Sequence, residues 1–126
     1  MKIIAIPDIH GRVDKMMPYF DQIQAADVVI LVGDLTNGSL ETAKHVLESI
    51  GKHNTRILTI PGNMDTDAIV DYTDEQGYNI HTTYQVIDGV AFVGFGGALP
   101  FAGAYVYSEA QYTDMLAQLS IAVPDI

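Results

Sequence analysis

Three short runs rich in isoleucine, valine and leucine recur in the first half of this 126-residue chain, and they constrain its fold more than any other feature. The runs are Lys2–Pro7, Val28–Val32 and Arg56–Pro61. Continuous apolar runs of this length are typical of parallel strands, because a parallel sheet is covered on both faces. The segments between the runs have helical character. The pattern therefore predicts a parallel β-α-β-α-β core.

Helical periodicity is visible in the segments that follow each run. Residues 13–23 carry an apolar stripe, and so do residues 39–50. Ser39 fits the N-cap position of the second helix, and Gly51 is expected to close it. A short helix over Asp67–Gln76 follows the third run. We therefore expect one helix after each of the three strands.

The pattern changes in the second half of the chain. Tyr84–Ile87 and Val90–Gly94 flank the pair Asp88-Gly89, which favours a two-residue hairpin turn. Ser108–Leu119 predicts a last helix. The predicted fold class is α/β, a parallel core leading into an antiparallel hairpin. The length fits one domain over residues 1–126.

A polar motif follows each of the three runs directly. The motifs are Asp8-Ile9-His10-Gly11, Gly33-Asp34-Leu35-Thr36-Asn37-Gly38 and Gly62-Asn63-Met64-Asp65. In open α/β sheets, ligands bind at the carboxyl ends of the strands. Each motif alone is a good turn, but three in order at successive strand ends are hard to explain as turns alone. They predict a functional site at one edge of the sheet.

Four residues of these motifs are candidate metal ligands. Asp8 and His10 are two residues apart, so we expect their side chains to leave an extended backbone on the same side. Asp34 has two oxygens with which to bridge two ions, and Asn63 offers a neutral amide oxygen. Imidazole and carboxylate together favour a transition metal such as Mn, Fe, Zn or Ni over calcium.

Together the motifs resemble those of the calcineurin-like metallophosphoesterase superfamily. Its members carry D-x-H, G-D-x-x-(N/D) and G-N-(H/x)-(D/E) in this order, and the later Gly94-Phe95-Gly96-Gly97 is similar to the Icc-related prokaryotic phosphoesterases. The resemblance implies that Asp8 and His10 bind the first of two divalent metals, Asp34 bridges, and Asn63 binds the second. It also implies hydrolysis of a small phosphoester by a hydroxide that the two metals activate.

The resemblance also implies which residues act beside the metals. The family often has histidine after Gly-Asn as a general acid, but this chain has Met64, which favours phosphodiesters with good leaving groups over monoesters. Asp65 is the candidate catalytic residue that remains, by orienting its neighbours, although it also fits a helix cap. Arg12 and Asn37 are candidate substrate-binding residues, with an exposed position at a helix start as the alternative for Arg12.

The resemblance implies a fold of two sheets packed face to face between helices, of which this chain supplies about half. The family completes its site downstream with a Ser/Gly-His motif and a Gly-His-x-His pair. After Asp65 the only histidine is His81, which belongs to neither motif. His45 and His53 lie at the wrong sheet end, and we expect both side chains to be solvated. We therefore expect a domain that lacks its C-terminal part. A catalytically incomplete scaffold for protein binding is the alternative function.

Composition also limits the binding partners and the cellular location that we expect. A formal net charge of −10 opposes binding to nucleic acid or anionic lipid, and no apolar run approaches the ~20 residues of a membrane span. With no cysteine and no signal peptide before the first strand, we expect a cytoplasmic protein. An uncovered sheet face would favour pairing of two chains, unless a longer natural protein covers it.

Two features of the second half stay open. Its tyrosines either form a wall on which a nucleobase stacks or are partly buried against a sheet and loop. The loop 96–103, with Pro100 and Phe101, either covers the metal site as a substrate lip or connects to further structure.

Overall fold

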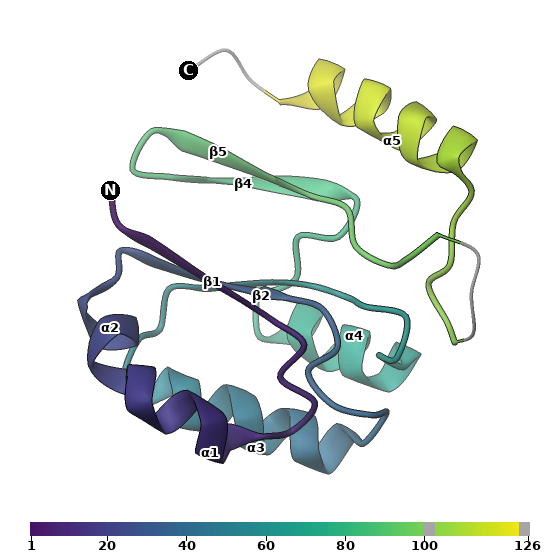
Figure 1. The fold of residues 1–126 in the computed structure, drawn as a ribbon. Coiled ribbons are helices and arrows are strands. Elements are labelled where there is room, and N and C mark those ends of the chain that lie inside the picture. The colour runs from purple at the N-terminus through teal and green to yellow at the C-terminus, as the bar shows by residue number, and fades with distance from the viewer. Residues whose placement is uncertain (100–102, 124–126) are drawn as a thin grey trace.

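The computed structural model describes residues 1–99 and 103–123 (Figure 1). The strands are β1 (Ile3–Pro7), β2 (Val28–Val32), β3 (Ile57–Ile60), β4 (Thr83–Ile87) and β5 (Val90–Gly94). The helices are α1 (Val13–Met16), the 3-10 turn η1 (Met17–Tyr19), α2 (Phe20–Ala25), α3 (Leu40–Gly51), α4 (Asp67–Glu75) and α5 (Glu109–Ala122). Within the described residues, no helix is long and apolar enough to cross a membrane.

The first three strands form one parallel sheet in the order β1-β2-β3, which confirms the predicted core. Pro7 is level with Val32, and Val32 is level with Ile60. The last residues of the three strands are therefore cross-strand neighbours. Because of this register, the three polar motifs begin side by side at one edge of the sheet.

One face of the sheet packs on the helices α1 to α4 (Figure 1). The main hydrophobic core lies in this layer, and its largest fully buried side chains include Ile23, Leu31, Leu35, Ile50 and Ile69. Ile23, Ile50 and Ile69 come from the helices and Leu31 from the middle strand, while Leu35 lies in the loop that follows this strand. Their burial against one another fixes the sheet edge from which the motifs project.

The opposite face is covered over β2 and β3 by the β4-β5 hairpin, and α5 lies on the outer side of the hairpin (Figure 1). Val28, Leu58 and Ile80 form a second core, against which Ile87 and Phe92 pack. The expectation of strands covered on both faces is confirmed for these two strands. It is wrong for β1, where exposed and half-buried residues alternate, because the hairpin does not reach this edge strand.

The helix expected over residues 13–23 is broken into α1, η1 and α2. Pro18 lies at the start of η1 and has no N–H to donate to the preceding turn. Met16 and Ile23 are buried on either side of the break. The apolar stripe therefore still faces the core, although the helix that carries it is not continuous.

The predicted N-cap of α3 and the hairpin turn are confirmed. The expectation that Gly51 caps the end of α3 is wrong, because Gly51 is the last helical residue and Lys52 is the C-cap. Ser39 caps α3 by accepting a hydrogen bond from the Thr42 N–H at 3.2 Å, and Ser108 begins α5 in a capping box. Asp88 and Gly89 both have left-handed backbone, with φ of 50° and 78°, as a type I′ hairpin turn requires. Short-range sequence chemistry alone determines these features.

Candidate metal centre

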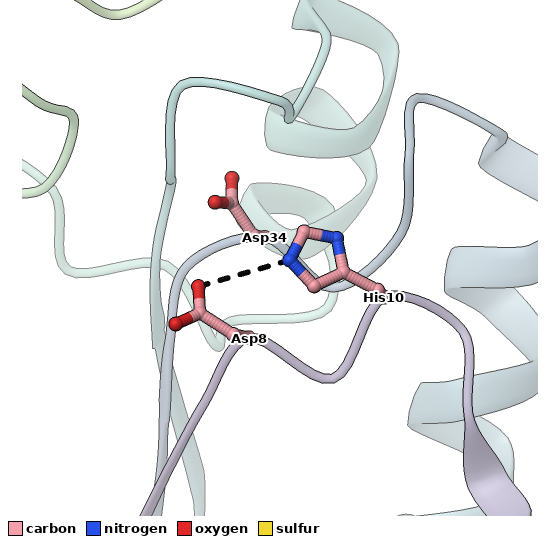
Figure 2. A group of neighbouring side chains, drawn as sticks. All are labelled: Asp8, His10 and Asp34. Carbon is pink, nitrogen blue, oxygen red and sulfur yellow. Dashed lines mark ion pairs between the residues drawn. The ribbon is translucent and has the colours of Figure 1, made fainter.

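Three candidate ligands come together at the carboxyl edge of the parallel sheet. Asp8 and His10 lie in the loop after β1, and Asp34 lies in the loop after β2 (Figure 2). One ligand atom from each residue lies within 4.8 Å of the other two. The ring nitrogen of His10 that faces Asp8 is Nε2, which is 3.9 Å from Asp8 Oδ1.

This donor set fits a divalent transition metal. Such an ion binds nitrogen and oxygen ligands at about 2.0–2.2 Å, so two ligand atoms of one ion are at most about 4.4 Å apart. The observed separations, all within 4.8 Å, need only a small contraction. Two carboxylates and an imidazole form a typical ligand set for manganese, iron, zinc or nickel. The residues present therefore fit a divalent transition metal, as the sequence predicts.

The backbone brings the triad together in a way that the sequence did not predict. Asp8, His10 and Asp34 have φ values of 51°, 48° and 50°, so all three are left-handed. The expectation that Asp8 and His10 leave an extended strand on one side is therefore wrong. The chain turns sharply after β1, and the His10 N–H donates to the Asp34 carbonyl at 3.0 Å. Left-handed backbone at non-glycine residues is strained, and such strain clusters at functional sites.

Close backbone contact joins the loop of Asp34 to the loop of Asn63. A side chain on Gly62 would meet the Asp34 backbone nitrogen at 2.6 Å, and one on Gly33 would meet the Gly62 nitrogen at 2.8 Å. The Met64 N–H donates to Asp34 Oδ1 at 2.9 Å. The glycines therefore allow the second and third motifs to touch, and this contact orients the Asp34 carboxylate.

Asp65 lies below this junction and holds it together. Its side chain is buried, Oδ2 accepts from the N–H groups of Asp34 and Gly62 at 2.9 and 2.8 Å, and Oδ1 accepts from Leu35 N–H at 3.2 Å. Burial raises the pKa of the Asp65 carboxyl, and the three N–H donors oppose this shift. Thr66 caps α4 in its place. These contacts are those of a positioning residue, and a catalytic role for Asp65 stays a prediction.

Asn63 lies half-buried in the same loop, next to the contact between Met64 and Asp34. Its carbonyl accepts from the Ala104 N–H at 2.9 Å, and the Gly97 N–H donates to the Pro61 carbonyl at 2.6 Å. The segment after β5 is therefore docked on the Asn63 loop at both of its described ends. The predicted substrate lip at Pro100 and Phe101 lies outside the described residues.

The two predicted substrate-binding residues have partners within the chain. Asn37 Oδ1 lies 2.8 Å from Nδ1 of His10. The Arg12 guanidinium makes two hydrogen bonds to Asp14, of 3.0 and 2.9 Å. Both groups of this second pair are exposed, so it holds Arg12 only weakly. Arg12 also lines a groove of about 440 Å³ that runs from Asp8 along the outer edge of β1.

An aromatic cluster anchors the segment after β5, and its centre is His81. Gly96 N–H donates to His81 Nδ1 at 3.0 Å, and His81 Nε2 lies 3.0 Å from the Tyr107 hydroxyl. Phe95 stacks on the ring of His81 at 5.3 Å between centroids, and Tyr105 meets its edge. Only the density of tyrosines in the sequence pointed to this cluster, and a structural role for them was one of the two alternatives.

We expect the protein to become less stable as the pH is lowered, because of the protonation of His81. Burial lowers the pKa of this histidine because it penalises the charged ring. The neutral ring accepts the Gly96 N–H at Nδ1. The unfolded chain, with a histidine pKa of about 6.5, therefore binds the proton more readily. The stabilisation is complete above this value and is lost as the pH falls through the lower folded pKa. The neighbouring Tyr105 and Tyr107 do not titrate in this range.

The matched variant is His81→Gln, which cannot titrate. We expect the difference in Tm between wild type and variant to shrink as the pH falls from about 7.5 to about 5. Thermal melts followed by circular dichroism measure it. A difference that stays constant over this range would show that the His81 ring is not held neutral.

The other two histidines lie away from the site. His45 is exposed on α3, as expected. His53 is half-buried and stacks on Phe20 with 4.3 Å between ring centroids, so the expectation of a solvated side chain is wrong for His53. Neither residue joins the group of Asp8, His10 and Asp34.

The arrangement matches known proteins in sequence and in fold. A sequence profile described as calcineurin-like phosphoesterase matches residues 1–120. Protein MJ1162 of Methanocaldococcus jannaschii is 30% identical over 120 residues, which are 92% of this chain and 53% of that protein. The crystal structure of TT1561 of Thermus thermophilus has a TM-score of 0.78 at 16% identity, over 95% of this chain and 62% of that one.

A second solved structure shows the same likeness, with a TM-score of 0.78 at 16% identity over 98% of this chain and 65% of the other. At this identity the likeness establishes the fold alone. The chain thus spans about half the length of its relative MJ1162 and less than two thirds of the TT1561 chain.

Proposed function

The chain belongs to the calcineurin-like phosphoesterase family, and we propose that it hydrolyses small phosphodiesters with two divalent transition metals at the edge where its three parallel strands end. The observation that carries the proposal is the convergence of Asp8, His10 and Asp34 to within 4.8 Å. Asp8 and His10 would hold the first metal, Asp34 would bridge, and Asn63 would serve the second. The activity, substrates and partners of the whole protein are part of this proposal.

The chain's own residues prepare this site before any metal binds. Asp65 fixes the backbone of Asp34 and Leu35, and the Met64 N–H fixes one oxygen of Asp34. Such fixed orientation of ligands supports metal affinity. When bound, divalent cations supply Lewis acidity, which activates water and neutralises charge on a phosphoryl group.

The preference for diesters is argued from Met64. This side chain is 39% exposed beside Asp34, at the position where a histidine would act as a general acid. A thioether has no proton to give to a leaving group. Loss of a general acid typically costs about 10²–10⁴ in rate, and the loss is smallest for good leaving groups. Activated diesters are therefore the favoured substrate class.

A second candidate function is a protein-binding scaffold with an incomplete site, and one observation favours it. Both ring nitrogens of His81 are occupied, by Gly96 and by Tyr107, so this histidine does not supply a further ligand. A metal held by Asp34 and Asn63 alone would have fewer than the three protein ligands of a typical catalytic site. The two functions differ in whether the chain turns over a phosphoester.

The remaining proposals concern the molecule as a whole. We propose that residues 1–126 form one metallophosphoesterase-like domain of a cytoplasmic protein, with its C-terminal part absent from this chain. The net charge of −10 argues against a nucleic-acid surface. Pairing of two chains would use the exposed face of β1, where Ile3 is 46% exposed.

The test is hydrolysis of bis-p-nitrophenyl phosphate with Mn²⁺, with p-nitrophenyl phosphate as the monoester comparison. We expect faster turnover of the diester, and a loss of at least about 100-fold in the Asp34→Asn variant, which keeps the shape of the ligand but not its charge. The exposed Asp74→Asn on α4 is the matched control and should keep full activity. No turnover above the metal-only blank, from folded protein, would favour the scaffold.

A further inference from the structure

The contact between Asn37 and His10 has a consequence for the chemistry of the histidine. Nδ1 of His10 faces Asn37 Oδ1 at 2.8 Å, and Nε2 faces Asp8. An amide oxygen only accepts hydrogen bonds, so a neutral His10 ring must donate its proton from Nδ1. The lone pair of the ring is then on Nε2, on the side of the two carboxylates.

We propose that Asn37 is a positioning residue that holds His10 in the tautomer with Nδ1 protonated, so that the Nε2 lone pair faces Asp8 and Asp34. The hydrogen bond of one ring nitrogen decides which form the other takes, and metal-binding histidines usually have such a partner. In this proposal Asn37 orients His10, in place of its expected role in substrate binding. The inference rests on the proposed function in one respect only, namely that the Nε2 lone pair binds a metal.

The loop of Asn37 is fixed independently of His10. Thr36 is 1% exposed, and its hydroxyl oxygen accepts from the N–H groups of Gly38 and Ser39 at 2.9 and 3.0 Å. Leu35, also buried, accepts from the Gly11 N–H at 2.7 Å through its carbonyl. The backbone on both sides of Asn37 is therefore held, and the exposed amide is presented to the ring.

A neutral amide suits this position because of the charge around it. Asp8 and Asp34 already place two carboxylates beside the His10 ring. A carboxylate in place of the Asn37 amide would add a third negative charge to this group. An amide oxygen orients the ring without adding this charge. The expected result is a ring that is already correctly oriented in the absence of metal.

The first experiment measures the tautomer directly in the metal-free chain. ¹⁵N chemical shifts of the imidazole nitrogens at about pH 8 distinguish the two forms, with His10 assigned from a His10→Gln variant. We expect protonated Nδ1 in wild type, a mixture in Asn37→Ala, and recovery in Asn37→Asp, which keeps an acceptor oxygen. The exposed His45 is the internal control and should not change. Protonated Nε2 in wild type, or an unchanged tautomer in Asn37→Ala, would overturn the proposal.

The second experiment measures Mn²⁺ affinity by calorimetry on the same proteins. We expect about 10–100-fold weaker binding in Asn37→Ala and less than about 10-fold in Asn37→Asp. Weaker binding without a change of tautomer would also overturn the proposal. If the tautomer shifts as expected while wild type binds no Mn²⁺, the positioning role stands and the proposed metal-dependent function fails. The two experiments therefore test the positioning role of Asn37 separately from the proposed metal-dependent function.

Discussion

Replacing Gly62 by alanine is expected to lower the free energy of unfolding by about 3 kcal/mol or more and to abolish Mn²⁺ binding. The new Cβ would lie 2.1 Å from Asp34 Oδ1 and 2.6 Å from the Asp34 backbone nitrogen. The first contact pushes the ligand away, and the second acts on backbone that Asp65 and the strand register hold in place. Neither neighbour can yield without opening the junction of the two loops.

The matched control is Gly51→Ala, at the last residue of α3. A Cβ there meets nothing within 4 Å, so this variant should be unchanged or up to about 1 kcal/mol more stable. Urea unfolding gives the free energies, and calorimetry with Mn²⁺ gives the affinities. Equal stability of Gly62→Ala and wild type would mean that the loops of Asp34 and Asn63 are further apart than the structure shows.

The Asp65→Asn variant is expected to lose about 2–4 kcal/mol of stability although it keeps the shape of the side chain. The carboxylate accepts three N–H groups through two oxygens. The asparagine amide has one acceptor oxygen, so its NH₂ group must face at least one N–H donor at a buried position. An unsatisfied buried donor costs more than the hydrogen bond it replaces.

The loss should appear in metal binding as well as in folding, since two of the three donors flank the Asp34 ligand. The exposed Asp74→Asn on α4 is the control for the charge change and should leave both quantities unaltered. Denaturant midpoints and Mn²⁺ titration of each variant provide the comparison. A fully stable Asp65→Asn variant with normal affinity would contradict the positioning role of Asp65.

Much of the fold could be predicted from short segments. The three apolar runs, the Asp88-Gly89 turn and the caps at Ser39 and Ser108 each act through neighbours a few residues away. Their chemistry is local, and their boundaries in the structure differ by only a few residues. The broken first helix is the exception. Pro18 has no N–H for the helical hydrogen bond, and the pattern of apolar residues alone does not reveal this break.

The candidate site was predicted as a set of residues but not as an arrangement. The order of the motifs after parallel strands placed Asp8, His10 and Asp34 at one edge, and the structure brings them together there. The predicted backbone conformation was wrong. All three residues have left-handed backbone, whereas the spacing rule assumes an extended strand. Asn37 and Arg12 were assigned to substrate, and each has a partner within the chain.

The sequence by itself determined the positions of the strands along the chain, the faces of the helices and the residue types at the carboxyl edge, because hydrophobic periodicity and turn chemistry act over a few residues. Only the tertiary structure decided which atoms meet there. Asn37 reaches His10 across 27 positions, Asp65 reaches Asp34 across 31, and Tyr107 reaches His81 across 26. Hydrogen bonds between segments so distant depend on how the loops pack, and that packing is a property of the assembled core rather than of any local run of residues.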